Sequence, residues 1–410
     1  MKGVIKISVI QLVEKHCINK NNKYYDLLDH CCYMSKNLYN FANYHIRQSF
    51  TKDNIYLNYS KIDKLMKLKE NEKDYRNMVN SQSAQQCLKL LDKNWKAFFS
   101  AIKDYNKHKE KYLGRPKLPK YLPKNGRNIL IFTNQICKLE NGYIHFPKKM
   151  NGFTIKTELK SFQQIRVLPR GNKMVIEIVY NKEIIEPKED NGKYLSIDLG
   201  LDNLVTLTNN LNKQPIIISG RKIKSINQYY NKQMSHYREI AKRMNKLDYT
   251  KKMDKLTNKR NNLIDDLIHK ASRKVVNYAL SYGVNTIVIG NNKNWKQNSK
   301  MSAKVNQNFI SIPHSKLIQQ IEYKAKMVGI NVLITEESYT SGTSFLDNEL
   351  PIKENYNKSR RVFRGLFVSN KGIKINSDVN GSLQIMKKVF PNVFSHGIEG
   401  YGFNPIRVGI

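Results

Sequence analysis

Long apolar runs are missing from this sequence. The longest are the length of a single strand, as in Ile129–Phe132 and Ile216–Ile218. A membrane-spanning helix needs about 20 predominantly apolar residues, so none is expected. The first residues, MKGVIKISVIQLVEK, alternate and lack the uninterrupted apolar core of a signal peptide. We therefore expect an intracellular protein.

Cysteine is scarce, and no two cysteines form a C-x-x-C pair. The five cysteines are Cys17, Cys31, Cys32, Cys87 and Cys137. An odd number without paired spacing is typical of reduced thiols rather than of a disulfide framework. A structural zinc site built from two C-x-x-C pairs is also excluded.

Acidic residues are few relative to basic ones. Lys and Arg number 71 against 33 Asp and Glu, which gives a formal net charge of +38 at pH 7. Repulsion among so many positive charges destabilises a compact chain unless a polyanion lies nearby. Nucleic acid is the natural counter-charge, and the alternative is a merely well-solvated basic surface. The 410 residues suffice for two or three hydrophobic cores.

The N-terminal half divides by its hydrophobic period. Residues 4–12 alternate as a strand, whereas apolar positions between 25 and 112 follow a helical period that we interpret as the core of a helix bundle. Further strand-like segments span 128–133, 143–147, 164–169 and 173–180. Short strands separated by turn residues favour a small β-barrel. The N-terminal strand would join this barrel, and the helical region would be an insertion.

A basic, proline-broken segment lies between the helices and these strands. Gly114, Pro116, Pro119 and Pro123 break the helix within residues 107–127, and Tyr112 and Tyr121 lie between basic side chains. Such a segment suits a nucleic-acid strand, with phosphates neutralised and bases stacked, although a solvated linker is the alternative. The candidate nucleic-acid-binding residues are Lys107, Lys109, Lys111, Arg115, Lys117, Lys120, Lys124 and Arg127.

The C-terminal half has the most regular order of elements. Strand-like segments at 194–200, 204–210 and 215–220 precede a charged helical hairpin at about 225–281 that breaks near Asp248–Thr250. Two further strands, 286–290 and 331–335, alternate with a helix, and a final helix runs from near Asp378 to about Phe390. The order β-β-β-α-β-α-β-α is that of an RNase H-like α/β domain, with a mixed five-stranded sheet covered by helices.

Two aspartates stand where such a domain would hold metal ions. Asp198 lies inside the apolar strand YLSIDLG, where a carboxylate is costly unless it has a ligand. Asp378 lies at the start of the final helix, where an ordinary N-cap is the alternative. Phosphodiester hydrolysis in this architecture uses two divalent cations, and carboxylates are suitable ligands for Mg²⁺. We therefore predict that both aspartates bind metal.

Three sequence blocks resemble the TnpB family of transposon-encoded nucleases. These are SIDLGLDNLVTLT, ESYTSGTSF and NSDVNGSLQIMKK, while GRPKLPKY and QIRVLPRGNKMVIEIVY resemble upstream parts of the family. The family is related to type V CRISPR effectors and to Fanzor proteins. The resemblance implies a Mg²⁺- or Mn²⁺-dependent RuvC-type endonuclease with two metal ions. It also implies a guide RNA from the transposon end and cleavage of double-stranded DNA beside a short adjacent motif.

The same resemblance implies a division into domains. Residues 1–22 and 113–190 would form a β-barrel wedge domain, and residues 23–112 an inserted α-helical recognition domain. Residues 191–410 would form the RuvC-like nuclease domain. Many relatives carry a zinc ribbon after the Tyr-Thr-Ser block, but here Ser344 replaces its first cysteine and no cysteine follows Cys137. We therefore expect no zinc and a reduced insert at about 345–375, around RRVFRG.

The third metal-binding carboxylate that the resemblance implies is not at its usual position in this sequence. Many relatives place it at the end of the fourth strand, where this chain has Gly290. A subset of the family places the acid in an E-x-Y-T-S block, which Glu337 matches, with Glu336 beside it. The predicted catalytic and metal-binding trio is therefore Asp198, Glu337 and Asp378. The alternatives are a nuclease-inactive RNA-guided DNA-binding repressor, favoured by Gly290, and a DNA transposase with RNase H-type catalysis.

Overall fold

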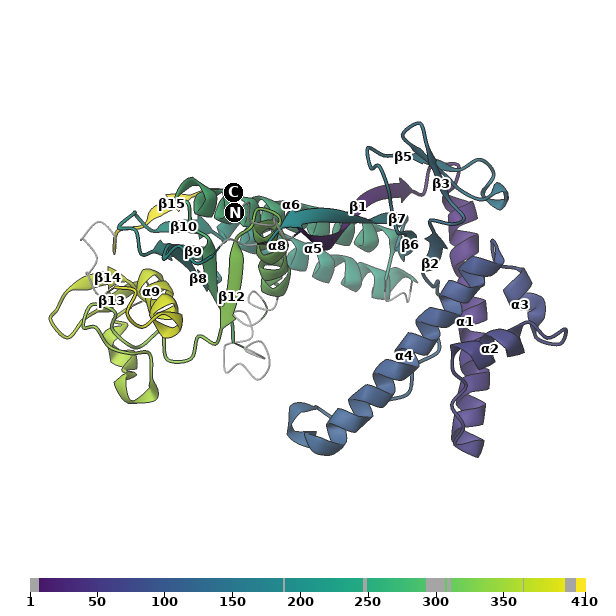
Figure 1. Ribbon diagram of the computed structural model, residues 1–410, viewed down its shortest axis with the longest axis horizontal. Coiled ribbons are helices and arrows are strands. Elements are labelled where there is room, and N and C mark those ends of the chain that lie inside the picture. Colours follow the sequence, from purple (N-terminus) through teal and green to yellow (C-terminus); the bar gives the residue numbers. More distant parts are fainter. Residues whose placement is uncertain are drawn as a thin grey trace, which may run out of the picture. The chain divides into compact units, whose positions relative to one another are not determined.

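The computed structural model describes residues 7–186, 189–245, 249–292, 307, 311–363, 365–394 and 403–410. It contains two compact units (Figure 1). The N-terminal unit is Val9–Lys182, and the C-terminal unit is Glu183–Ile410 together with Met1–Ser8. Residues 4–6 of the expected first strand, and Asp248 at the expected break of the hairpin, lie outside the described residues. No described helix is long and apolar enough to cross a membrane.

The helices of the N-terminal unit are α1 (Tyr25–Asp53), α2 (Tyr59–Met66), α3 (Glu72–Arg76) and α4 (Ser81–Lys107). The apolar stripe of α4 is buried against α1 as expected, with Trp95 fully buried. The Trp95 indole donates a hydrogen bond of 2.9 Å to Asn43 Oδ1, so its polar group is satisfied inside the core. The helical interpretation of this region is confirmed.

The strands of this unit form two sheets rather than one ring. The first has the order β1-β7-β6-β2, from β1 (Ile7–Asn19), β7 (Lys173–Ile185), β6 (Gln164–Arg170) and β2 (Leu130–Thr133). The second is β3 (Lys138–Glu140), β4 (Tyr143–His145) and β5 (Thr154–Lys156). Among the described residues neither sheet closes on itself, in contrast to the expected barrel. The sequence did not indicate β3 and β5, because three-residue strands are too short to show a period.

The C-terminal unit is built on a six-stranded mixed sheet of order β12-β11-β8-β9-β10-β15. Its strands are β8 (Tyr194–Leu199), β9 (Asn203–Asn209), β10 (Ile216–Ser219), β11 (Thr286–Gly290), β12 (Asn331–Thr335) and β15 (Ile406–Val408). Both β11 and β12 run parallel to β8, whereas β9 is antiparallel to it. The expected sheet of five strands is corrected to six, because β15 pairs in parallel with β10.

Different helices cover the two faces of this sheet. Alternate residues of β8 point to opposite faces. Leu195, Ile197 and Leu199 belong to a core with α6 (Lys251–Ser281) and α8 (His314–Lys326), and α5 (Arg221–Asn245) packs on α6. The other face of β8 meets α9 (Ser377–Val389).

Beneath α9 lies a buried cluster of three hydroxyl side chains, Ser196, Thr208 and Ser382. The Ser196 and Thr208 hydroxyls are 2.6 Å apart, and the Thr208 and Ser382 hydroxyls 2.9 Å. Ser196 Oγ also donates to the Ser382 carbonyl at 2.7 Å, and Ser382 Oγ donates to the Ser196 carbonyl at 3.1 Å. The cluster therefore joins β8, β9 and α9 by hydrogen bonds inside the core.

The segment between β12 and α9 is held by polar contacts and a short hairpin. The hairpin pairs β13 (Leu366–Val368) with β14 (Lys374–Asn376), and Phe367 and Ile375 pack against α9. Glu349 Oε2 accepts hydrogen bonds from the Ser344 N–H (2.8 Å) and from Arg360 (2.6 Å). Both charged side chains are largely buried, at 14% and 16% exposure, so this ion pair organises the segment from within.

Candidate active site

Asp198 is the fifth residue of β8 and lies on the face covered by α9. Ile197 and Leu199 are buried on the opposite face, so β8 presents the Asp198 carboxylate alone toward the site. Burial, together with the nearby charges of Glu337 and Asp378, raises the pKa of Asp198 well above its usual value. Space for this carboxylate depends on Gly381 of α9, because a Cβ there would lie 3.1 Å from Asp198 Oδ2.

Asp378 is the second residue of α9 and does not cap it. Asn376 is the N-cap, and its Oδ1 accepts the N–H groups of Asp378 (3.0 Å) and Val379 (3.2 Å). The Asp378 carboxylate is thereby left to other partners. It accepts a hydrogen bond of 2.6 Å from Asn203 Nδ2 and lies 3.4 Å from Arg361 Nη2. The N-cap alternative for Asp378 is therefore wrong.

Glu337 follows β12 by two residues and reaches the space above Gly290. Its Oε1 accepts a hydrogen bond of 3.1 Å from Asn292 Nδ2, and its own N–H donates to Asn292 Oδ1 at 3.1 Å. Its Oε2 is buried and has no hydrogen-bond partner in the described part of the chain. Burial raises the pKa of Glu337 to about 7, which the nearby Lys388 ammonium partly opposes. Glu336, in contrast, is exposed.

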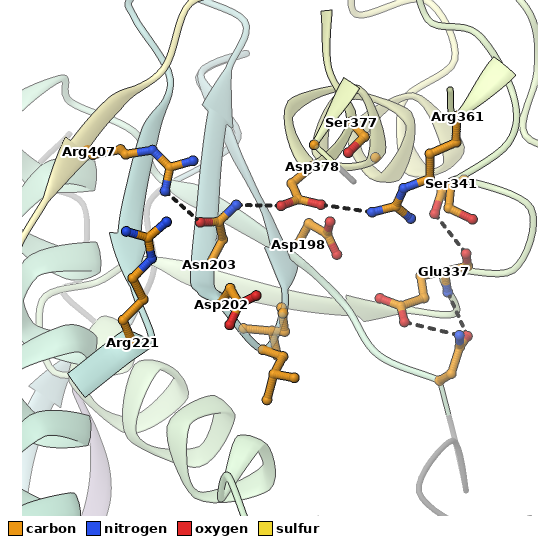
Figure 2. Close-up of a pocket in the computed structure, with 17 residues that line it drawn as sticks. Asp198, Asp202, Asn203, Arg221, Glu337, Ser341, Arg361, Ser377, Asp378 and Arg407 are labelled. Atoms are coloured by element: carbon orange, nitrogen blue, oxygen red, sulfur yellow. Dashed lines mark hydrogen bonds and ion pairs between the residues drawn. The ribbon is translucent and has the colours of Figure 1, made fainter. Parts of the chain in front are cut away.

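The three carboxylates line one cavity of about 410 Å³. Figure 2 shows Asp198, Asp378 and Glu337 facing this space, with the Arg361 guanidinium reaching toward Asp378. Sequence reasoning missed most of the other polar residues of its wall, because no periodic pattern marks them as neighbours of the three acids. These residues are Asp202, Asn203, Arg221, Asn292 and Arg407.

The donor set suits a hard divalent cation, since all three acids offer oxygen ligands. The buried Oε2 of Glu337, without a partner, is the observation that fits such a ligand best. In this conformation, however, no group of three or more His, Cys, Asp or Glu residues within the described ranges is arranged to hold a metal ion. The Asp378 carboxylate instead accepts hydrogen bonds from Arg361 and Asn203.

The basic segment after α4 lies along α1 and is fixed there through its backbone. Asn40 Nδ2 donates to the Leu122 carbonyl, Asn43 Nδ2 to the Pro119 carbonyl, and Lys36 Nζ to the Lys124 carbonyl, at 2.9–3.1 Å. Because the backbone makes these bonds, the side chains are left outside. Seven of the eight candidate nucleic-acid-binding residues are exposed: Lys107, Lys109, Lys111, Arg115, Lys117, Lys120 and Lys124.

Arg127, the eighth, differs. Its guanidinium makes a bidentate ion pair with Asp29, at 2.9 and 2.6 Å, and lies over the Tyr33 ring. This arrangement attaches the end of the segment to α1 and leaves Arg127 less available to a phosphate than the other seven. Tyr121 is exposed and has Arg47 over its ring.

A pocket of about 480 Å³ lies beside this segment. Phe50, Phe98, Pro116 and Leu118 give it an apolar lining, and the basic residues Arg47, Arg115, Lys117 and Lys120 also line it.

The fold and the candidate site define an α/β unit of the RNase H type, with acids at the ends of two parallel strands and at a helix start. Residues 177–296 match the family model OrfB_IS605, described as a probable transposase, and residues 314–385 match the Cas12f1-like TNB domain. These two matches confirm the resemblance to the TnpB family and its type V CRISPR relatives.

One curated relative is the TnpB-like protein ORF457 of Acidianus two-tailed virus. It is 25% identical over 305 residues, which cover 70% of this chain and 57% of the relative, so this chain matches little more than half of that protein. Among solved structures, Cas12f1 in a complex with sgRNA and target DNA has a TM-score of 0.37 at 16% identity, covering 91% of this chain and 98% of its own. The mini-RNA-guided endonuclease CRISPR-Cas phi3 has a TM-score of 0.44 at 9% identity, covering 97% and 94%.

Proposed function

We propose that this protein is an RNA-guided DNA endonuclease encoded by a transposable element. The observation that carries the proposal is the convergence of Asp198, Glu337 and Asp378 on one cavity. The family matches support a nuclease of this type, and the charge of +38 supports binding of nucleic acid. The partners would be a guide RNA from the transposon end and a double-stranded DNA target beside a short adjacent motif. The protein would act in the cytoplasm and nucleoid, or in a nucleus.

The three acids would hold two Mg²⁺ or Mn²⁺ ions. Divalent cations in such a site activate water and stabilise the leaving oxygen of the phosphodiester. Asp378 would exchange its contact with Arg361 for a cation, which frees the Arg361 guanidinium for a phosphate of the substrate. Asp198 would be the central metal ligand, because its carboxylate lies between those of Asp378 and Glu337 (Figure 2).

The N-terminal unit would bind the nucleic acids. We propose that its helices, within 23–112, form the recognition domain, and that the strands within 1–22 and 113–190 form the wedge domain. The exposed basic residues of the segment after α4 would contact the phosphate backbone. Residues 191–410 would form the nuclease domain, with a zinc-free insert at 345–375.

The deciding experiment is Asp198→Ala in the full chain with its own guide RNA. We expect cutting of a matched target to be abolished while RNA and target binding stay within about two-fold, because the change removes a metal ligand and no phosphate contact. Equal loss of binding and cutting would count against the assignment. Cleavage of the parental protein should require Mg²⁺ or Mn²⁺.

Two alternatives make different predictions. A nuclease-inactive repressor would bind a matched target and never cut it at any Mg²⁺ or Mn²⁺ concentration, and Gly290 is the feature that favours it. A DNA transposase would join cut ends to a second DNA, and the family description "probable transposase" favours that test. Incubation of the ribonucleoprotein with a matched target and an acceptor plasmid separates all three outcomes.

A further inference from the structure

Asn292 lies two residues after Gly290, the last residue of β11, and uses its whole amide on one neighbour. Its Nδ2 donates to Glu337 Oε1 and its Oδ1 accepts the Glu337 N–H, each at 3.1 Å. One side chain therefore bonds both the main chain and the carboxylate of the same residue. Such a pair of bonds fixes the position of Glu337 and the rotation of its side chain together.

A second element holds the next residue. Lys388 of α9 donates from Nζ to the carbonyl of Ser338 (3.1 Å) and to its hydroxyl (3.0 Å). The loop that carries Glu337 is thus attached on one side to the end of β11 and on the other to α9. These two attachments hold the Glu337 loop at a fixed position beyond the end of β12.

Gly290 makes room for this arrangement. A Cβ at residue 290 would lie 2.5 Å from Ile385 Cδ1 and 3.0 Å from Glu337 Oε2. A side chain at residue 290 would therefore crowd both the Ile385 side chain and the Glu337 carboxylate. Glu337 Oε1 is bonded to Asn292, while Oε2 is buried without a partner among the described residues. One oxygen is anchored and the other is left for a ligand.

We propose that Asn292 is a positioning residue. It holds the carboxylate of Glu337 in place, a role that β11 would have for an acid at residue 290. The inference rests on the proposed function and extends it to a residue that does not itself bind the metal. An amide suits this role because it donates to the carboxylate and accepts from the N–H at once. Aspartate would lose the donor and add a like charge, and alanine would lose both bonds. Residues that hydrogen-bond a metal ligand without binding the metal themselves contribute about 10–100-fold to metal affinity.

The test measures Mn²⁺ binding to the full chain by calorimetry, beside its metal-free melting temperature. Asn292→Ala should weaken Mn²⁺ binding about 10–100-fold, and Asn292→Asp at least as much. Asn291→Ala is the matched control, since among the described residues Asn291 bonds only through its backbone N–H, at 2.9 Å from the Thr335 carbonyl. It should bind Mn²⁺ as the parent does, and its metal-free melting temperature should equal that of the parent.

A double-variant cycle separates positioning from general damage. In the Glu337→Gln background, Asn292→Ala should cause no further loss of Mn²⁺ binding, because the residue that Asn292 positions has already lost its charge. Additive losses, or parental Mn²⁺ binding in Asn292→Ala, would overturn the inference, as would a parent that binds no Mn²⁺. A parent that binds Mn²⁺ but cuts no matched target would instead contradict the proposed function and leave the role of Asn292 standing.

Discussion

The buried carboxyl of Glu337 makes the stability of the metal-free protein depend on pH. Its pKa is raised from 4.5 to about 7, so the folded state holds the proton more tightly than the unfolded state. The associated stability is fully present below about pH 4.5 and is lost as the pH rises through about 7. We expect the melting temperature in EDTA to fall between pH 5 and pH 8, and to fall less in Glu337→Gln. Equal slopes in both proteins would contradict this.

The two neighbouring acids after β12 should differ sharply in their effect on cutting. Glu337→Gln should eliminate cleavage, since it removes the carboxylate above Gly290, whereas Glu336→Gln should only weaken it, because Glu336 is exposed. Single-turnover cleavage rates with the native guide RNA give the comparison. Parental cutting by Glu337→Gln would mean that another acid, such as Asp202 in the same cavity, completes the site.

Single residues also show how far sequence reasoning reaches. Asp198 is predictable because a carboxylate between two buried apolar residues of a strand needs a partner. Asp378 is harder, since an N-cap Asp and a ligand Asp look alike, and only the hydrogen bonds of Asn376 separate them. Arg361 and Asn292 lie in loops without a period. Their place in the site depends on tertiary contacts that no local pattern encodes.

At the scale of elements, the buried ion pair between Glu349 and Arg360 stabilises the segment between β12 and α9. Glu349→Ala would leave Arg360 largely buried without its partner and remove the acceptor of the Ser344 N–H. We expect a loss of about 1–3 kcal/mol in stability and faster proteolysis between residues 345 and 375. Glu354→Ala, at an exposed position of the same segment, should have little effect.

Chelation of zinc should not reproduce the effect of Glu349→Ala. Treatment with a zinc chelator should leave proteolysis of the segment unchanged, because Ser344 and Glu349 hold the turn by hydrogen bonds. One stoichiometric zinc per chain in elemental analysis would contradict this prediction.

The basic segment after α4 should contribute to affinity through charge. Lys117→Ala with Lys120→Ala should weaken nucleic-acid binding and reduce the slope of log affinity against log salt by about 2, because each lysine would neutralise one phosphate. Lys64→Ala with Lys69→Ala removes the same charge from exposed positions elsewhere in the N-terminal unit. An equal change of slope in this control would assign the effect to net charge alone.

The elements themselves were largely predictable. The strands around Asp198 and the helix around Trp95 have strong periods, and both are where the sequence placed them. The three-residue strands β3, β5 and β15 were not predictable, since three residues are too few to show a period and their strand character comes from pairing with neighbouring strands. The barrel expectation depended on how strands join, and strand pairing is set by tertiary contacts.

For the whole molecule, the charge of +38 predicts a protein that is isolated with its RNA. Purified from its native locus, the chain should retain one discrete RNA species with defined ends, since base pairing needs a specific guide. Sequencing of the co-purified RNA at low and moderate salt is the measurement. Heterogeneous RNA that is fully displaced at moderate salt would indicate electrostatic binding without guidance.

The hydroxyl cluster under α9 has a consequence for how the two aspartates are spaced. Ser196 lies two residues before Asp198 on the same face of β8, and Ser382 lies one helical turn after Asp378 on the same side of α9. Apolar surfaces can slide past each other at little cost, but hydroxyls that bond one another and the opposite backbone have a single satisfactory alignment. The distance between the carboxylates is therefore dictated by the core beneath them, before any ion or substrate arrives.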